Sequence, residues 1–240
     1  MGIAIKGRGS TTHMAGRFEV TVSEAVDDGW EPDDSDEFAT PRLRTEVRAE
    51  TARSIISRNK SPDVGFSQSV NPYRGCEHGC SYCFARPSHA YLNLSPGLDF
   101  ETKLFAKTNA AQLLRKEFSR PGYVPQPIAL GINTDAYQPI ERKLKLTRQL
   151  IEVMLETQHP FSLMTKNALV ERDIDLLAPL AEKNLVSVHF SVTSLDPHLS
   201  ARLEPRASAP HARLRAMRRL HAAGIPVGVM VAPVIPWIND

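Results

Sequence analysis

The sequence predicts an α/β fold in which a parallel sheet is covered by helices. Short apolar segments of strand length alternate along the chain with longer segments in which apolar residues recur at helical spacing. Strands that alternate with helices in this way are typical of a parallel sheet with helices outside it. The chain has 240 residues, of which 42% are hydrophobic, so it is long enough to bury a substantial core.

The predicted elements follow one another in a regular order. Short apolar segments are predicted to be strands over residues 66–73, 127–132, 161–165, 186–192 and 226–231. The helices between and after them are predicted over residues 82–93, 110–118, 144–155, 169–182 and 209–223. Asn109 is a candidate N-cap and Gly224 a candidate C′ residue. Residues 102–107 are expected to form a short extended segment.

The N-terminal part of the chain differs in composition from the rest. The stretch 31–37 is acidic and shows no apolar periodicity. We therefore expect residues 1–50 to form a poorly ordered or wrapping N-terminal arm and residues 51–240 to form the core. Residues 236–240 resemble a loop that leads into a further helix, so we also expect the C-terminal part of the core to be missing.

Charge and hydropathy restrict the location and the partners. The formal net charge is +2, from 29 basic and 27 acidic side chains, which creates no strong field for a nucleic acid. No secretory signal is evident, and the most apolar stretch, 227–235, is too short to span a bilayer. We therefore expect a cytoplasmic protein with no membrane partner. A basic helix leaves nucleic-acid binding open as an alternative, through Arg213, Arg215, Arg218 and Arg219.

All three cysteines of the chain lie in one short loop, with the spacing C-x3-C-x2-C: Cys76, Cys80 and Cys83. A [4Fe–4S] cluster normally takes four thiolates, so three would leave one iron open to an outside ligand. The odd number of cysteines and the lack of a secretory signal argue against a disulfide framework. A zinc site with His78 as the fourth ligand and a set of inert buried thiols are the alternatives.

The cysteine loop closely resembles that of radical S-adenosylmethionine (radical SAM) enzymes, in which the amino and carboxylate groups of SAM bind the open iron. Further segments resemble the branch grouped with spore photoproduct lyase and related DNA repair photolyase proteins: residues 54–59, 71–76, 83–87, 95–101, 133–135, 137–141 and 229–233. The resemblance covers residues 50–240. It implies a partial (βα) barrel of the radical SAM type, apparently truncated after about five βα units.

The resemblance also implies a SAM site at the C-terminal ends of the strands, where barrels of this type gather their chemistry. SAM carries a carboxylate, for which Lys166 or Arg206 could supply the cation. The other candidates are short polar residues for the amino group or the ribose, and one aromatic residue for the adenine: Asn133, Asp135, Ser191 and Tyr82.

The implied function is that of a radical SAM enzyme with a [4Fe–4S] cluster and SAM as cofactors. The enzyme would cleave SAM reductively to a 5′-deoxyadenosyl radical that acts on an unidentified substrate, with a flavodoxin- or ferredoxin-like electron donor as partner. A DNA lesion (pyrimidine dimer) lyase is one alternative. Spore photoproduct lyase uses a further cysteine as hydrogen donor, which this chain lacks. The donor then lies in the missing C-terminal part, or a tyrosine such as Tyr137 serves, or the reaction is different. A non-enzymatic zinc or structural iron–sulfur protein is the other alternative.

Overall fold

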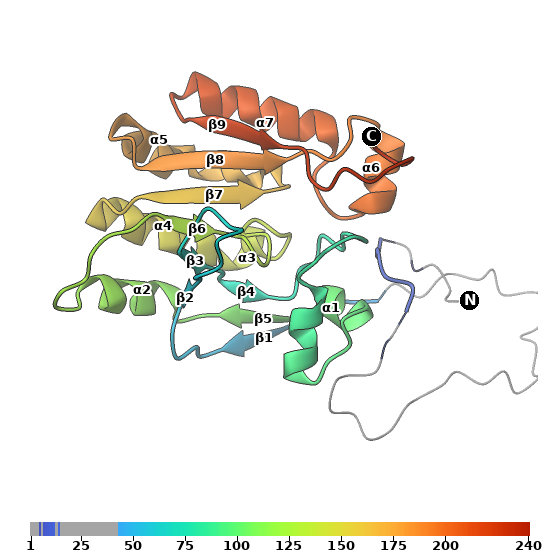
Figure 1. Ribbon diagram of the computed structural model, residues 1–240, viewed down its shortest axis with the longest axis horizontal. Coiled ribbons are helices and arrows are strands. Elements are labelled where there is room, and N and C mark those ends of the chain that lie inside the picture. Colours follow the sequence, from blue (N-terminus) through green and yellow to red (C-terminus); the bar gives the residue numbers. More distant parts are fainter. Residues whose placement is uncertain (1–4, 6, 13, 15–42) are drawn as a thin grey trace, which may run out of the picture.

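The computed structural model describes residues 5, 7–12, 14 and 43–240. In this part of the chain the strands form two sheets (Figure 1). A six-stranded sheet has the order β2-β3-β6-β7-β8-β9, and a three-stranded sheet has the order β1-β5-β4. The acidic stretch 31–37 and most of the predicted N-terminal arm lie outside the described residues.

The six-stranded sheet confirms the predicted α/β fold. Its strands are β2 (Ile56–Arg58), β3 (Gln68–Val70), β6 (Ile128–Leu130), β7 (Phe161–Thr165), β8 (Val186–Ser191) and β9 (Val227–Met230). All neighbours from β3 to β9 pair in parallel, and β2 is an antiparallel strand at one edge. Within the described residues the sheet stays open and does not close into a barrel.

Helices that follow the strands supply the other half of the core. They are α2 (Ala110–Phe118), α4 (Leu146–Thr157), α5 (Ile174–Glu182) and α7 (Pro210–Ala222). Their apolar side chains pack against buried strand residues in a single cluster, which includes Leu114, Leu150, Leu163, Phe190 and Leu220. The apolar alternation of β7, in which Phe161 and Leu163 are buried, matches the period of two expected for a strand.

The three-stranded sheet was not predicted. Its strands are β1 (Glu46–Glu50), β4 (Tyr73–Arg74) and β5 (Lys103–Lys107), and only β5 matches an expected extended segment. The segment 66–73 is divided between β3 and β4, which belong to different sheets. Pro72 interrupts it, because proline has no N–H group for a ladder hydrogen bond. The strand β1 lies before residue 51, within the stretch expected to form the N-terminal arm.

Several helix boundaries also differ from the prediction. Only a 3₁₀ helix, η1 (Arg86–Leu92), follows the cysteine loop, and the predicted helix 144–155 consists of α3 (Glu141–Leu144) and α4. The predicted helix 169–182 begins as the 3₁₀ helix η2 (Ala168–Asp173) before α5. The short helices α1 (Leu98–Thr102) and α6 (Pro197–Leu203) complete the set.

Asn109 does not cap α2 with its side chain. Its amide instead bonds to both backbone groups of Ala52, accepting from the N–H at 2.9 Å and donating to the C=O at 2.9 Å. A long-range contact therefore takes the place of the expected local one. The C′ prediction for Gly224 is consistent with its φ of +77°.

No helix among the described residues is long and apolar enough to cross a membrane. The parallel strands all end at the same edge of the large sheet, and β4 leads directly into the cysteine loop. This arrangement gathers the strand ends and the cysteines at one side of the molecule.

Gly131 ends β6 in a conformation that only glycine adopts freely. Its φ is +82°, and an added Cβ would lie 2.9 Å from the carbonyl oxygen of Met164. We expect Gly131→Ala to lower the free energy of unfolding by about 2–4 kcal/mol, from backbone strain and overpacking together. Gly224→Ala is the control, since Gly224 has a similar φ but open space around it. Urea unfolding followed by circular dichroism compares the two, and equal losses would contradict the prediction.

Candidate active site

A cavity of ≈ 370 Å³ lies at the C-terminal ends of β6, β7 and β8, beside the cysteine loop. Its walls contain the three cysteines and most of the polar residues predicted for the site: Cys76, Cys80, Cys83, Tyr82, Asn133, Asp135, Lys166 and Ser191. Segments far apart in the sequence thus meet at one cavity, as the strand-end prediction required.

The three thiols suit an iron–sulfur cluster. Cys76 and Cys80 are buried and Cys83 is half-buried. Burial raises the pKa of all three thiols, and that of Cys80 to about 12, because burial disfavours the charged thiolate. A cation bound beside the sulfurs would favour the thiolate form. Among the described residues no three His, Cys, Asp or Glu groups converge on one point where a single metal ion could bind. A cluster does not require such convergence, because each thiolate binds a different iron.

Both ring nitrogens of His78 have polar neighbours other than the cysteines. Its side chain is 1% exposed, and its Nδ1 lies 3.3 Å from Oδ2 of Asp135. Its Nε2 lies 3.4 Å from the amide nitrogen of Asn167. These neighbours count against the zinc alternative, in which His78 is the fourth ligand.

The cysteine loop is fastened to its surroundings by backbone hydrogen bonds. The N–H of Cys76 donates to the C=O of Phe100 at 2.9 Å. The side-chain amide of Gln138 forms two hydrogen bonds with the start of the loop. Its oxygen accepts from the backbone N–H of Glu77 at 2.9 Å, and its nitrogen donates to the backbone C=O of Gly75 at 3.1 Å. These contacts fix the loop relative to α1 and to the segment that follows β6.

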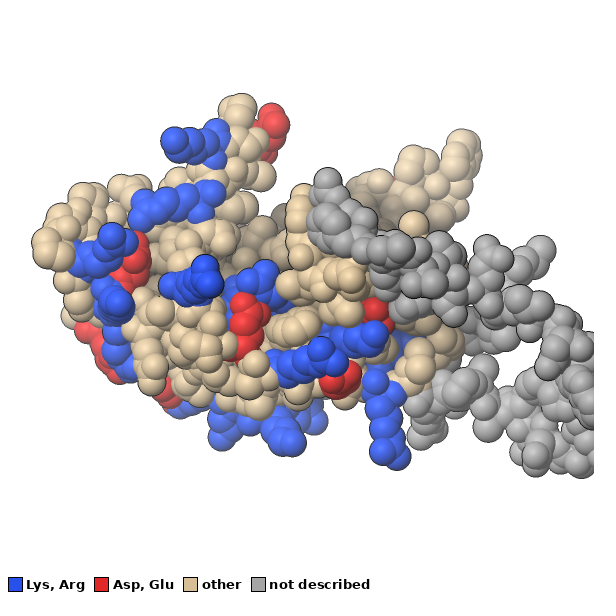
Figure 2. Space-filling view, turned by 90° about the horizontal axis from the view of Figure 1, so that it is seen from below, with Lys and Arg blue, Asp and Glu red and all other residues tan. Residues whose placement is uncertain are grey.

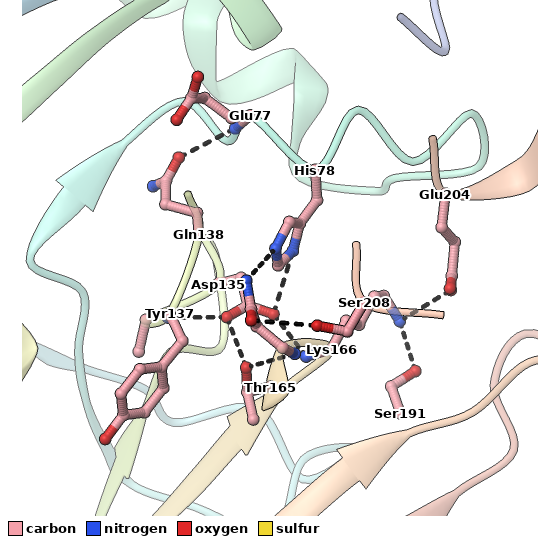
Figure 3. Close-up of polar contacts among 12 residues, drawn as sticks. Glu77, His78, Asp135, Tyr137, Gln138, Thr165, Lys166, Ser191, Glu204 and Ser208 are labelled. Carbon is pink, nitrogen blue, oxygen red and sulfur yellow. Dashed lines mark hydrogen bonds and ion pairs between the residues drawn. The ribbon is translucent and has the colours of Figure 1, made fainter. Parts of the chain in front are cut away.

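Asp135 organises the strand ends (Figure 3). Its carboxylate accepts from the backbone N–H of Tyr137 at 2.8 Å, from the hydroxyl of Thr165 at 2.8 Å and from the backbone N–H of Lys166 at 2.7 Å. Burial would raise the pKa of Asp135, but His78 and these donors hold it below its usual range. The oxygens of this carboxylate are thus engaged by the protein itself.

Lys166 projects its ammonium group between the cavity and a buried acid (Figure 3). The Nζ atom hydrogen-bonds to the hydroxyl of Ser191 and lies 3.4 Å from Oε1 of Glu204. It also lies 5.6 Å from the centre of the Tyr82 ring, within cation–π range. The Tyr82 hydroxyl donates to the same carboxylate of Glu204. One buried acid therefore holds both a cation and an aromatic ring of the cavity wall.

Glu204 is a contact residue that was not among the candidate site residues predicted from the sequence. Its side chain is 0% exposed and forms an ion pair with Arg213 of α7. The sequence offers only a weak signal for it, an acidic residue shortly after a strand and a short helix. Its contacts come from four positions that meet only in the folded chain: Tyr82, Lys166, Thr193 and Arg213.

Two predicted residues lie outside the cavity wall. Arg206 pairs with Glu77 at 3.0 Å, so its guanidinium binds the back of the cysteine loop instead of facing the cavity. Tyr137 is buried, and its hydroxyl donates to Asp173 at 2.8 Å. The position of Tyr137 counts against its predicted role as a hydrogen donor.

Residues 70–240 match the family model of the Radical SAM superfamily. The chain belongs to the radical SAM superfamily. This radical SAM protein is 43% identical over 185 residues to the protein Rv2578c of Mycobacterium tuberculosis. The matched region covers 76% of this chain and 54% of that relative. It is 27% identical to the protein MJ0683 of Methanocaldococcus jannaschii, over 79% of this chain and 68% of the relative. The chain thus spans about half the length of the mycobacterial relative.

Solved structures with a similar fold include spore photoproduct lyase complexed with dinucleoside spore photoproduct, with a TM-score of 0.54 and 20% identity. That match covers 79% of this chain and 52% of the lyase. A mutant of the lyase with bound AdoMet and dinucleoside spore photoproduct gives the same TM-score at 21% identity, over 78% of this chain and 51% of the other. The predicted resemblance to this branch is confirmed at the level of the fold.

The radical SAM domain implies a [4Fe–4S] cluster and SAM as cofactors, as the sequence predicted. The residues present fit both groups. Three thiols without a fourth protein ligand leave an iron open, and the cavity beside them combines a cation, polar groups and an aromatic ring.

Proposed function

We propose that this chain is the catalytic part of a radical SAM enzyme, with Cys76, Cys80 and Cys83 as cluster ligands and SAM in the adjoining cavity. The observation that carries the proposal is that the three thiols and the Lys166 ammonium line the same cavity. When bound, the cluster and SAM supply a 5′-deoxyadenosyl radical through reductive cleavage of SAM. The protein contributes binding, orientation and exclusion of water.

The cavity residues divide the binding of SAM among themselves. Lys166 is the cation for the SAM carboxylate, because it lines the cavity and Arg206 does not. Asn133 and Ser191 offer polar groups to the amino group or the ribose, and the Tyr82 ring flanks the adenine. Asp135 acts indirectly, since it holds the backbone of Lys166 and the side chain of Thr165 in place.

The enzyme needs a one-electron donor, and we propose an external protein of the flavodoxin or ferredoxin type. Phe84, which follows Cys83, offers this donor a surface to bind beside the cysteine loop. Its side chain is 76% exposed, although large apolar side chains are usually buried. A donor protein that covers Phe84 would come close to the cysteines.

A lesion lyase acting on DNA is the second candidate, because the fold resembles spore photoproduct lyase. The basic helix left open as a nucleic-acid contact offers it mixed support. Arg213 is buried and Arg219 pairs with Glu171, whereas Arg215 and Arg218 are exposed. The face shown in Figure 2, which is seen from below Figure 1 and not from the side of α7, carries both basic and acidic side chains. Binding to ultraviolet-damaged duplex that weakens with rising salt would favour this candidate, and indifference to DNA would count against it.

Anaerobic reconstitution with iron and sulfide, followed by electron paramagnetic resonance (EPR) with and without SAM, tests the proposed function. We expect about four iron atoms per chain and a signal that changes when SAM is added. Cys80→Ala should lose the intact cluster and all SAM cleavage, since a buried ligand is removed. Ser81→Ala is the matched control, because Ser81 is an exposed neighbour in the same loop.

Two results would contradict the proposal. The first is a Cys80→Ala variant that still holds a complete cluster and cleaves SAM. The second is a colourless protein with one zinc ion per chain, which would favour the non-enzymatic zinc alternative. A cluster signal indifferent to SAM would favour a structural or electron-transfer cluster.

A further inference from the structure

An N-terminal segment lies against a buried carboxylate behind the cysteine loop. The side chain of Glu101, at the end of α1, is 0% exposed. Its two oxygens accept from the backbone N–H of Gly9 at 3.1 Å and from that of Ser10 at 2.9 Å. The guanidinium of Arg8 donates to the backbone C=O of Glu101 at 2.8 Å. Three successive residues, more than ninety positions away in the sequence, thus converge on one residue.

The same carboxylate holds the cysteine loop from its other side. Arg86 lies 2.6 Å from an oxygen of Glu101. The guanidinium of Arg86 also donates to the backbone C=O of Cys80 at 2.8 Å and 3.2 Å. Glu101 therefore connects the N-terminal segment to the backbone of a cluster ligand through a single arginine. A buried carboxylate needs such donors, because its charge is costly without them.

The contact between the two segments is close enough to require glycine. A Cβ added to Gly9 would lie 1.8 Å from the carbonyl oxygen of Gly79, in the middle of the cysteine loop. Gly79 has a φ of +64°, and its own Cβ would lie 2.7 Å from Oε2 of Glu101. The backbones of the two segments thus approach each other where no side chain could fit between them.

A second connection runs through Arg8. Its side chain donates to the hydroxyl of Thr45 at 3.0 Å, and Thr45 donates to the carboxylate of Glu77 at 2.7 Å. Glu77 follows the first cluster ligand, Cys76. Arg8 is 8% exposed, so it is a buried cation rather than a surface charge. It contacts the backbone of Glu101 directly and the carboxylate of Glu77 through Thr45.

We propose that residues 8–10 are part of the cluster site. They complete the hydrogen bonding of Glu101, a positioning residue that holds the cysteine loop in shape through Arg86. This inference rests on the proposed function, since it assigns the segment a role in retaining the cluster. If the segment only covered the surface, it would not bind Glu101, the residue whose partner Arg86 donates to the backbone C=O of Cys80.

The test compares two variants of the 240-residue chain, each with one substitution in the N-terminal segment. Gly9→Ala displaces the segment by steric overlap, and Thr11→Ala is the matched control, because Thr11 is exposed. After anaerobic reconstitution, iron release to a chelator is followed by absorbance. Gly9→Ala should lose iron about tenfold faster than the parent protein, as expected when hydrogen bonds to a buried carboxylate are broken. Thr11→Ala should lose iron at the parental rate.

A second variant and a second measurement separate this inference from the proposed function. Glu101→Gln should release iron as fast as Gly9→Ala, because the amide cannot replace the charge facing Arg86. In the cluster-free protein, hydrogen exchange of the amides at 79–83 should accelerate in both variants and stay parental in Thr11→Ala. This readout needs neither iron nor SAM, so it tests the segment even if the parent protein holds no cluster.

Parental iron release and parental exchange in Gly9→Ala would overturn the inference. It would also be overturned if Glu101→Gln alone accelerated release, because Glu101 would then act without the N-terminal segment. A failure of the parent protein to hold a cluster would count against the proposed function instead.

Discussion

Lys166→Met is expected to weaken SAM binding by roughly 10- to 100-fold, the value of one charge-assisted hydrogen bond to a carboxylate. The ammonium group of Lys166 lines the cavity next to the cysteines, whereas methionine keeps the length of the side chain without the charge. Glu204 keeps its ion pair with Arg213 in this variant, so the wall of the cavity should retain its shape. The cluster content should stay unchanged. Titration of the reduced cluster with SAM, followed by EPR, measures the affinity.

Arg206→Met is the matched control for Lys166→Met. Both residues were candidates for the SAM carboxylate, but Arg206 is bound to Glu77 outside the cavity. Its substitution should change SAM affinity by less than about twofold, since a partly exposed ion pair away from the ligand contributes little. Weaker binding in Arg206→Met together with unchanged binding in Lys166→Met would reverse the assignment.

The sequence predicted the parts of the site that depend on local patterns. The cysteine spacing is a local signal, and the strand ends follow from the apolar segments before them, so Asn133, Lys166 and Ser191 were placed at a common edge. The parallel order of the strands followed from their alternation with helices. These features require no knowledge of which distant segments meet.

The features that could not be predicted depend on long-range contacts. Glu204 contacts the cysteine loop, β7 and α7 at once, and no local pattern records such a meeting. Asn109 has the sequence signature of an N-cap but bonds to Ala52. The strand β1 is rich in charged residues and forms only because β5 offers its edge. In each case tertiary contacts outweigh local preference.

Glu204→Ala is expected to produce a large loss of stability, about 3–5 kcal/mol, because it leaves a buried guanidinium without its counter-ion. The Arg213 side chain is 1% exposed. Its remaining partners are the carbonyl oxygens of Ser208 at 2.7 Å and Ser191 at 2.8 Å, which cannot balance its charge. Burial would raise the pKa of Glu204, but Lys166 and Arg213 hold it below the ordinary value, which favours the ionised acid.

The same helix supplies the control for this loss. Arg219 of α7 also pairs with a glutamate, Glu171, but its side chain is 63% exposed. Arg219→Ala should therefore cost less than about 1 kcal/mol. Thermal unfolding should show a decrease of about 10 °C for Glu204→Ala and at most a few degrees for Arg219→Ala. Equal shifts for the two variants would contradict the assignment of Glu204 as the buried centre of the site.

The double variant Glu204→Ala/Arg213→Met distinguishes the two sources of this loss. If the main cost is the unpaired charge, removal of both partners should recover part of the stability lost by Glu204→Ala alone. If the main cost is the lost packing of Tyr82 and Thr193 around the acid, the double variant should be less stable still. We expect partial recovery, because the guanidinium is fully buried and its other hydrogen-bond partners among the described residues, the carbonyl oxygens of Ser208 and Ser191, supply no counter-ion. SAM affinity should not recover with it, since Tyr82 and Lys166 both lose the carboxylate that positions them.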